Sequence, residues 1–332
     1  MDPRDQPGGN ERGCASVSSI LLADIGGTKS RFALGGSSGR PQQILVIEDD
    51  AFPSLEAAIA SYLEKTGVSP RSAVLAVAGP IDGEEIALTN RASWRFRRDE
   101  MARRFGFRQL RVVNDFEAIA WALPRLGAGD TRPLGKPTAP REGVKAVLGP
   151  GTGLGVATLV PMGGRWHVLA SEGGHALFGP QAQDEIEVFT RLFAEHGSIS
   201  AETVLSGPGL ARLAGALDPQ AVSRTPEMMV AGALNREPSA LAAARLFVRL
   251  LGRFAGGTAL TFKALGGVYI TGGVACGLGP LLDEAAFRAA FEAHPPYQAL
   301  LAGIPTLLMT CEEPGLIGCA TLAEEFAAAA PA

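Results

Sequence analysis

Two corners built from glycine and threonine are the parts of the sequence best suited to chemistry. The first, Gly26-Gly27-Thr28, separates two apolar runs and follows Asp24, and the second lies within PGTGLG at residues 150–155. Backbone N–H groups and a threonine hydroxyl can bind phosphate oxygens at such corners, because glycine has no Cβ to block a close approach. A carboxylate beside the first corner suits a Mg²⁺ ion held through water. Each corner alone is typical of a tight turn, but the pair, with Gly272-Gly273 further along, favours a nucleoside triphosphate held from two sides.

Two better-known phosphate motifs do not fit these glycines. In GGTKS, Thr28 stands between Gly27 and Lys29, so the spacing that a P-loop requires is absent. GPGTGLG at residues 149–155 precedes an expected strand rather than a helix, and the dinucleotide fingerprint therefore lacks its context. Lys29 can either contact phosphate or point to solvent, and both interpretations stay open.

A second group of polar residues is suited to binding and activating hydroxyl groups. Asn114-Asp115 ends an apolar run, where an acid can accept a proton from a hydroxyl and an amide can hold the same ligand. In isolation such a pair is more typical of a helix cap. Glu172 and His175 flank two glycines in SEGGH, which suits a polyhydroxylated ligand, whereas a zinc site needs further ligands. Glu202, in ISAETVLSGPG, is on its own typical of a solvated acid at a helix start.

The elements that would position these residues occur in two similar series. Each series begins with a strand, a Gly-Thr corner and a second strand, and a Gly- and Pro-rich stretch at residues 124–143 separates the two. This repetition predicts two related α/β halves around a cleft. The expected strands are Ile20–Asp24, Arg31–Leu34, Ile44–Ile47, Ala73–Ala78, Gln109–Val113, Lys145–Leu148, Val156–Val160 and Val268–Thr271. The expected helices are Ser54–Lys65, Glu117–Leu123, Glu185–Glu195, Gly209–Leu217 and Ala240–Leu265.

Composition and charge are those of a globular chain long enough for two domains. The chain has 332 residues, of which 46% are hydrophobic and 19% charged, and its formal net charge is −4. Nucleic-acid and membrane-surface partners usually require a basic excess, so neither is expected. Four cysteines without CxxC spacing predict reduced thiols and a cytoplasmic protein. Three arginines at helical spacing in Ala240–Leu265 predict a helix of a soluble domain with one polar face; they are Arg245, Arg249 and Arg253.

Nine motifs in order make the chain resemble a bacterial glucokinase of the non-ROK type, in the actin/hexokinase/Hsp70 ATPase superfamily. They are ADIGGT, AVAGPIDG, LTN followed by Trp94, VVNDFEAIA, GPGTGLGVA, EGGHALFGP, SAETVLSGPG, YITGGV and EPGLIG. ROK kinases carry a Cys-rich zinc loop after their Glu-Gly-His segment, whereas ALFGPQAQDEIEVF after His175 has no cysteine. The resemblance implies an α/β fold of two RNase H-like (actin/hexokinase-type) domains flanking a cleft. We expect a small domain at 18–125 plus 311–332, a large domain at 126–310, and a disordered leader at 1–17.

The resemblance also implies ATP-dependent phosphorylation of D-glucose at its 6-hydroxyl, which gives glucose 6-phosphate and ADP. Asp115 would be the general base, and the residues that bind the other sugar hydroxyls would be Asn114, Glu172, His175 and Glu202. The first phosphate segment would comprise Ala23, Asp24, Ile25, Gly26, Gly27 and Thr28, with Asp24 holding Mg²⁺ through water. The second phosphate segment would comprise Gly151, Thr152 and Gly153, and Gly272 and Gly273 would lie against adenosine. The same resemblance implies a homodimer.

Three other functions share parts of this pattern. A kinase for another hexose, such as mannose or an N-acetyl hexosamine, would keep all of these residues. A sugar-binding regulatory protein would need a DNA-binding domain, and only about nineteen polar residues precede the first expected strand. A chaperone-type ATPase would hydrolyse ATP without sugar. Hydrolases are disfavoured, because no serine lies in a G-x-S-x-G elbow.

Overall fold

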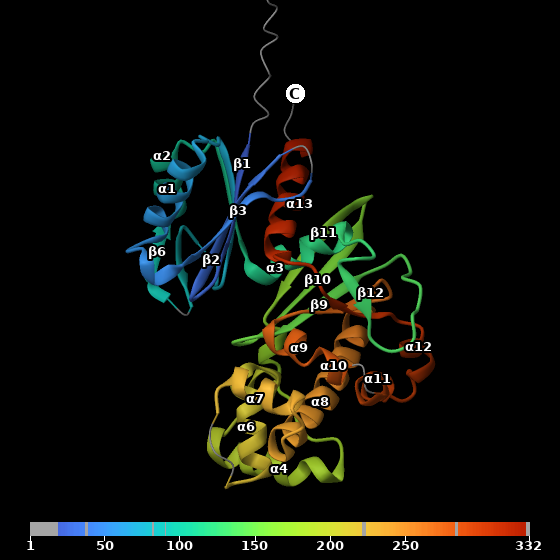
Figure 1. Ribbon diagram of the computed structural model, residues 1–332. Helices are drawn as coiled ribbons and strands as arrows, with labels where there is room; N and C mark the ends of the chain where they lie inside the picture. The colour runs from blue at the N-terminus through green and yellow to red at the C-terminus, as the bar shows by residue number, and fades with distance from the viewer. Residues whose placement is uncertain are drawn as a thin grey trace, which may run out of the picture.

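The computed structural model describes residues 19–36, 39–81, 83–89, 91–220, 224–282 and 285–329 (Figure 1). The leader expected at residues 1–17 lies outside the described residues, as does Cys14. Within the described part, the strands form two large sheets and a two-stranded ribbon, with helices around and between the sheets. The cysteines of this part, Cys276, Cys311 and Cys319, are free thiols.

The first sheet has five strands in the order β3-β2-β1-β4-β7. Their bounds in chain order are Ile20–Ile25 (β1), Lys29–Gly35 (β2), Gln42–Glu48 (β3), Ser72–Val77 (β4) and Gln109–Asn114 (β7). β2 lies antiparallel to β1 and β3, and β4 and β7 continue the sheet parallel to β1. On one side of this sheet lie the helices α1 (Leu55–Thr66) and α2 (Arg98–Phe105) (Figure 1). Ser54, a residue type common at helix N-caps, caps α1 by accepting a hydrogen bond from the Ala57 N–H at 3.3 Å.

The second sheet has six strands in the order β11-β10-β9-β12-β13-β8. Their bounds in chain order are Thr131–Pro133 (β8), Lys145–Pro150 (β9), Leu154–Met162 (β10), Arg165–Ser171 (β11), Gly267–Ile270 (β12) and Thr306–Met309 (β13). β9, β10 and β11 are antiparallel neighbours, and β12 and β13 follow parallel to β9. The edge strand β8 lies antiparallel to β13. The other five strands, three antiparallel followed by two parallel, have the same arrangement as the first sheet. The predicted duplication is therefore confirmed at the level of sheet topology.

Two helices lie between the sheets, α3 (Asp115–Ala122) and α13 (Pro314–Ala329). They contact each other and share one hydrophobic cluster with both sheets. The cluster includes Leu22 and Val74 from the first sheet and Val147 and Leu159 from the second. A Cβ at Gly318 would fall closer than 3.0 Å to the Ala118 carbonyl oxygen, so the glycine allows the two helices to pack tightly. α13 also contacts β1 and β4. The C-terminal segment thus returns to the first sheet.

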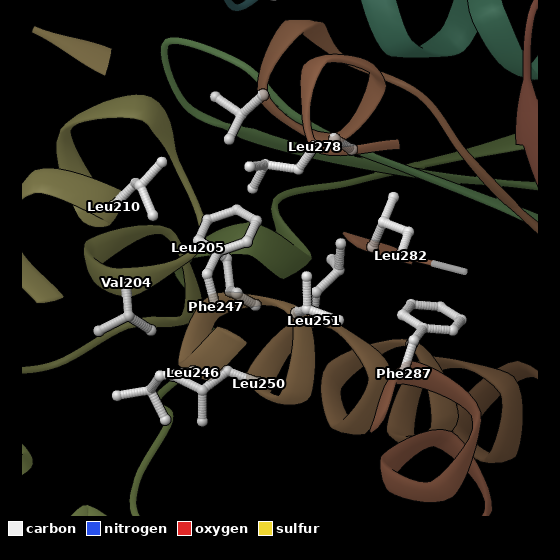
Figure 2. Packing of buried hydrophobic residues seen from close by; sticks show 14 of the residues in the cluster. Val204, Leu205, Leu210, Leu246, Phe247, Leu250, Leu251, Leu278, Leu282 and Phe287 are labelled. Carbon is white, nitrogen blue, oxygen red and sulfur yellow. The ribbon is translucent and has the colours of Figure 1, made fainter. Parts of the chain in front are cut away.

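The remaining helices extend from the second sheet (Figure 1). They are α4 (Gln183–His196), α5 (Ala201–Val204), α6 (Gly207–Leu217), α7 (Pro226–Leu234), α8 (Pro238–Phe262), α9 (Gly273–Gly277), α10 (Gly279–Leu282), α11 (Ala285–Glu292) and α12 (Gln298–Ala302). The shorter elements are the 3₁₀ turns η1 (Asp49–Ala51), η2 (Leu123–Arg125) and η3 (Gly173–His175), and the ribbon of β5 (Glu85–Leu88) and β6 (Arg91–Arg97). Figure 2 shows the core around α8, where Phe247 and Leu251 pack among side chains from neighbouring helices.

The long helix expected at Ala240–Leu265 is present as α8, but its polar face is not uniform. Arg253 is only 7% exposed, and it binds the fully buried Glu185 at 2.6 Å and the Gly179 carbonyl at 2.8 Å. The expectation of one polar face is therefore wrong for Arg253, because α4 supplies a buried carboxylate that pairs with it. No helix in the described part of the chain has both the length and the apolar character required to cross a membrane.

Candidate active site

The first glycine-threonine corner joins β1 to β2 at the edge where β4 and β7 also end. The Gly26 N–H donates to the Lys29 carbonyl at 3.2 Å, and a Cβ at Gly26 would lie 2.6 Å from that oxygen. This tight turn therefore requires glycine. Thr28 at its tip is exposed, whereas the side chains of Ala23 and Ile25 are fully buried in the core. These two residues of the expected phosphate segment can offer a ligand only their backbone.

Two carbonyl oxygens of this corner are bound from one side. The Asp49 N–H donates to the Thr28 carbonyl at 2.9 Å, and Arg91 Nε donates to the Gly27 carbonyl at 3.4 Å. Arg91 is itself held by Asp50 and lies over the Trp94 ring, 5.1 Å from the ring centroid. The Gly27 carbonyl and the Thr28 N–H belong to the same trans peptide and therefore point in opposite directions. The Thr28 N–H is thus turned away from Arg91, and a ligand can reach it from that other side.

Lys29 lies beside this corner at the protein surface. Its Nζ pairs with Glu48 Oε1 at 2.9 Å, and both side chains are more than half exposed. The register explains the pairing, because Lys29 and Glu48 are direct partners on β2 and β3. Of the two interpretations that the sequence leaves open, this structure has the side chain at the surface rather than over the corner.

Asp24 is a partly buried acid on β1, and its register partner on β2 is Arg31. The pKa of Asp24 is raised to about 7, and burial is the largest cause. The negative charges of Asp115 and Glu313 contribute to the rise, and Arg31 opposes it. Arg31 forms an ion pair with Glu313, which precedes α13. The Asp24 carboxyl therefore lies in a place where a bound cation would favour its charged form.

The surroundings of Asp24 fit a Mg²⁺ ion held mainly by water and by ligand oxygens. A Cβ at Gly315 would lie 2.5 Å from Asp24 Oδ2, so glycine is what allows α13 to begin this close to the carboxyl. Across the described residues, no group of three or more His, Cys, Asp or Glu side chains is placed to hold a metal. Mg²⁺ commonly takes one or two carboxylates and keeps several waters. Asp24 suits that role, with the charge of Asp115 close by.

Asn114 and Asp115 lie where β7 ends and α3 begins. Asn114 is the N-cap, because its Oδ1 accepts from the Phe116 N–H at 2.9 Å while its Nδ2 donates to the Gly79 carbonyl at 3.3 Å. Asp115 Oδ1 accepts from the same Phe116 N–H, also at 2.9 Å. Burial, with a smaller contribution from the charge of Glu172, raises the pKa of Asp115 to about 6, and these hydrogen bonds oppose the rise. The cap and the acid are thus adjacent parts of one helix start.

The second corner joins β9 to β10, and Glu202 is attached to it. The Gly151 N–H donates to the Gly153 carbonyl at 2.8 Å, and Glu202 Oε2 accepts from the Leu154 N–H at 2.8 Å. A Cβ at Gly153 would lie 2.5 Å from Glu202 Oε2. Glu202 lies in the first turn of α5, as its sequence context indicates, but only 32% of its side chain is exposed and one of its oxygens is bound to the corner. Thr152 and Glu202 line a pocket of about 230 Å³ whose wall continues through Thr203, Ser206 and Arg212.

His175 lies between two carboxylates. Its Nε2 is 4.0 Å from Glu172 Oε2 and its Nδ1 is 4.0 Å from Glu202 Oε1. The exposed fractions of the His175 and Glu172 side chains are 61% and 86%, so both are open to a ligand. Because the charge of Glu172 also reaches Asp115, the structure brings the sugar-binding residues expected from SEGGH and SAETV close to the start of α3.

Gly272 and Gly273 lie beside the second corner. Gly272 has a φ of +89°, and a Cβ there would fall closer than 3.0 Å to the Pro150 carbonyl oxygen, so only glycine suits the position. Gly273 begins α9 and has open space around it. α9 then leads to a pocket of about 650 Å³ that Cys276, Gly279, Met309 and Cys311 help to line.

Arg91 and Glu313 also shape this site, although their sequence context does not predict it. Arg91 lies within the LTN-Trp94 motif, yet only the folded ribbon brings it to the Gly27 carbonyl. Glu313 lies within EEPGLIG, and its pairing with Arg31 depends on the return of α13 to the first sheet. Arg91 and Glu313 are the charged residues of LTNRASW and EPGLIG, which is the available signal for both, but neither has its partner near in sequence.

Comparison with known proteins agrees with these features. A model of the Glucokinase family matches residues 21–326. The chain belongs to the glucokinase family. A glucokinase of Chelativorans sp. (strain BNC1) is 41% identical over 311 residues, which are 92% of this chain and 91% of that protein. The chain spans about half the length (49%) of the Burkholderia proteins named bifunctional that it also matches at 41% identity.

Solved glucokinase structures share the fold. The structure of a glucokinase from an Antarctic psychrotroph aligns with a TM-score of 0.83 at 33% identity, covering 93% of this chain and 99% of that one. A glucokinase from Balamuthia mandrillaris, solved in complex with glucose, aligns with a TM-score of 0.79 at 25% identity, covering 94% and 95%. The predicted family and the actin/hexokinase-type fold are both confirmed.

Proposed function

We propose that this protein transfers the terminal phosphoryl group of ATP to the 6-hydroxyl of D-glucose, giving glucose 6-phosphate and ADP. The position of Asp115 carries the proposal. Its carboxyl, with a pKa of about 6, is close enough to interact electrostatically with Asp24 at the first corner and with Glu172 on the sugar side. The 41% identity to a protein named glucokinase supports the activity, and glucose bound in the Balamuthia structure supports the substrate.

In the proposed reaction, Asp115 is the general base and accepts the proton of the 6-hydroxyl. The hydroxyl oxygen forms a bond to the γ-phosphorus, the bond from that phosphorus to the β,γ-bridging oxygen breaks, and ADP leaves with the electron pair. A pKa of about 6 keeps Asp115 mostly ionised at neutral pH and still basic enough to take the proton. Asp115 thus supplies the only proton transfer that the reaction needs.

The two corners would bind the triphosphate from opposite sides. The outward-facing Thr28 N–H and the backbone of Gly151, Thr152 and Gly153 would donate to phosphate oxygens. When bound, Mg²⁺ neutralises charge on the phosphate oxygens, and Asp24 would hold it through water. Glu313 engages Arg31, which leaves the Asp24 carboxyl available for this role.

The remaining polar residues would hold the sugar. Glu202 uses one oxygen to accept from the Leu154 N–H and keeps the other for a sugar hydroxyl. His175 and Glu172 are exposed, and each can bind a hydroxyl. Asn114 retains one amide hydrogen beyond the one it donates to Gly79. The four side chains together offer both donors and acceptors, as a hexose requires.

Adenosine would lie beyond the triphosphate, against Gly272 and Gly273. The open space at Gly273 supports this placement, as does the pocket that follows along α9. Thiol and thioether side chains from Cys276, Cys311 and Met309 form much of its lining and suit a flat aromatic base.

Several properties of the whole protein belong to the same proposal. We propose a homodimer in the cytoplasm, without nucleic-acid or membrane partners, supported by the family resemblance and by the net charge of −4. The proposed domains are 18–125 plus 311–332 and 126–310. The packing of α13 on β1 and β4 supports joining the C-terminal segment to the first sheet.

Release of ADP measured with and without D-glucose tests the reaction class. A kinase releases ADP only when glucose is present, whereas a chaperone-type ATPase releases it in both cases. A panel of glucose, mannose and N-acetylglucosamine, compared by kcat/KM, then decides the sugar. Sugar-independent release would refute the proposed function, and a preference for another hexose would change its substrate.

Replacement of Asp115 tests the general base. The Asp115→Ala variant should lose about 100-fold or more in kcat with little change in MgATP binding. Glu117→Gln is the matched control, because Glu117 is another partly buried acid of α3 whose pKa is raised by burial. Near-normal turnover in Asp115→Ala, or an equal loss in the control, would overturn the assignment.

A further inference from the structure

Phe116 is the residue between the proposed base and the rest of α3, and its ring lies on a pair of glycines in the other sheet. Gly149 on β9 and Gly155 on β10 are direct register partners. A Cβ at Gly155 would fall closer than 3.0 Å to ring atoms Cδ2 and Cε2 of Phe116, and a Cβ at Gly149 would do the same at Cζ and Cε1. Any other residue at either position would displace the ring. Because neither glycine has a side chain, the two positions leave a space that the Phe116 ring occupies.

The backbone of the same residue holds the proposed base. The Phe116 N–H donates to Asp115 Oδ1 and to Asn114 Oδ1, both at 2.9 Å. Its ring is meanwhile fixed on the β9–β10 hairpin, which carries the second phosphate corner at residues 151–153. One residue thus contacts the general base through its amide and the nucleotide-binding hairpin through its side chain.

The opposite side of α3 is also closely packed. Gly318 of α13 lies against the Ala118 carbonyl, too close for any side chain at that position. α3 is therefore held between α13 and the β9–β10 hairpin, and the Phe116 ring is the part that reaches the hairpin next to Asp115. A shift of α3 along the hairpin would require the Phe116 ring to leave the space over Gly149 and Gly155. Tight interiors resist such shifts, because they lack free volume.

We propose that Phe116, with Gly149 and Gly155, is a positioning residue that sets where Asp115 stands relative to the second phosphate corner. The inference rests on the proposed function, because it concerns the base of that reaction. In-line phosphoryl transfer needs the attacking oxygen and the γ-phosphorus at about 3–3.5 Å, and a misplacement of about 1 Å can cost about 100-fold in rate. A rigid ring seated on backbone is suited to hold the base within that tolerance.

The test compares the variants Phe116→Leu, Phe116→Ala, Gly155→Ala and the double variant Phe116→Ala/Gly155→Ala with a control, Phe105→Leu. Phe105 is another partly buried aromatic residue, on α2 in the core of the first sheet. For each variant we would measure kcat, the KM for glucose and MgATP, glucose binding by calorimetry, and thermal unfolding.

Phe116→Leu should lower kcat by roughly 10- to 100-fold while glucose binding and both KM values change less than about threefold. The control should lose similar thermal stability and keep its kcat. Gly155→Ala should also lower kcat, because its methyl group displaces the ring. Once the ring is absent the methyl has room, so the double variant should have the kcat of Phe116→Ala alone.

Two results would overturn the inference. One is a Phe116→Leu variant that loses stability like the control but keeps its kcat. The other is a double variant whose kcat losses simply multiply, since the ring and the glycine would then act independently. If Gly155→Ala does not fold, the kcat of Phe116→Leu compared with that of Phe105→Leu still tests the inference. A wild-type protein that phosphorylates no hexose would instead refute the proposed function, and this inference with it.

Discussion

The acid limb of the pH–rate profile provides the sharpest check on the site. Burial and the charge of Glu172 raise the pKa of Asp115 to about 6, against an ordinary value of 3.8. A general base must be ionised, so kcat/KM for glucose should follow the carboxylate fraction. The rate should be near its maximum at pH 8, half of it near pH 6, and about one tenth of it at pH 5. An unperturbed aspartate would keep most of its rate at pH 5.

Asp24 titrates in the same range and must be separated from Asp115. Its pKa of about 7 belongs to the ligand-free protein, and bound MgATP favours the ionised form. Varying glucose at saturating MgATP should therefore give a limb near pH 6, due to Asp115. Varying MgATP at saturating glucose should give a limb nearer pH 7, due to Asp24. ADP in quenched samples is the suitable readout, because a coupling enzyme would add its own pH dependence.

The variant Glu172→Gln links the limb to its cause. Removing this negative charge lowers the pKa of Asp115, so the glucose limb should move to lower pH by about half a pH unit. Glu117→Gln serves again as the control, because Glu117 is not among the groups that raise the pKa of Asp115. A glucose limb near pH 4 in the wild type, or a shift to higher pH in Glu172→Gln, would refute the electrostatic reasoning.

Three further predictions follow from other contacts. Asp24→Asn should stabilise the ligand-free fold in urea unfolding at pH 8 and much less near pH 4. A raised carboxyl pKa costs stability as pH rises from the ordinary value of 3.8 to about 7, and the full cost is present above that range. The gain at pH 8 should be about 2–4 kcal/mol, and an equal gain at both pH values would contradict it. Glu202→Ala should raise the KM for glucose roughly 10- to 100-fold. It should also raise the KM for MgATP, because the Leu154 N–H at the second corner loses its acceptor. An unchanged KM for MgATP would show that this corner does not depend on Glu202. Arg253→Met should lower the free energy of unfolding by about 3–5 kcal/mol, because Glu185 is left buried without its main partner. Chemical denaturation measures this free energy. A loss below about 1 kcal/mol would mean that water reaches Glu185.

Local features of the fold could be predicted from the sequence because they depend on neighbouring residues. The α1 cap at Ser54, the tight turn at Gly26 and the long helix α8 follow from capping chemistry, glycine geometry and helical periodicity. The repeated strand–corner–strand units predicted two related sheets, and β1–β2 and β9–β10 have that arrangement. The ribbon β5–β6 and the strand β11 were not predicted, because their apolar residues alternate with polar, charged or small ones and do not form the apolar runs on which the other strands were predicted.

The contacts that the sequence did not indicate concern charged residues whose partners are distant in the chain. Glu202 and Arg253 both have the sequence context of solvated residues. In the fold, Glu202 binds the Leu154 N–H 48 positions away, and Arg253 binds Glu185 68 positions away. Nothing within a few residues of either side chain indicates the partner, nor, for Arg253, the burial.

The sequence by itself determined which chemical groups this protein can use: two corners built from glycine and threonine, an acid near the end of β1 and another directly after β7, and a set of polar side chains suited to hydroxyls. The tertiary structure alone decided how they act together. The pKa of Asp115 depends on burial at the start of α3 and on Glu172, 57 positions later in the chain. The ion pair of Arg31, the register partner of Asp24, depends on Glu313, which lies directly before α13 and returns with it to the first sheet. Electrostatic energies depend on distance and solvent exposure, and both are properties of the folded chain.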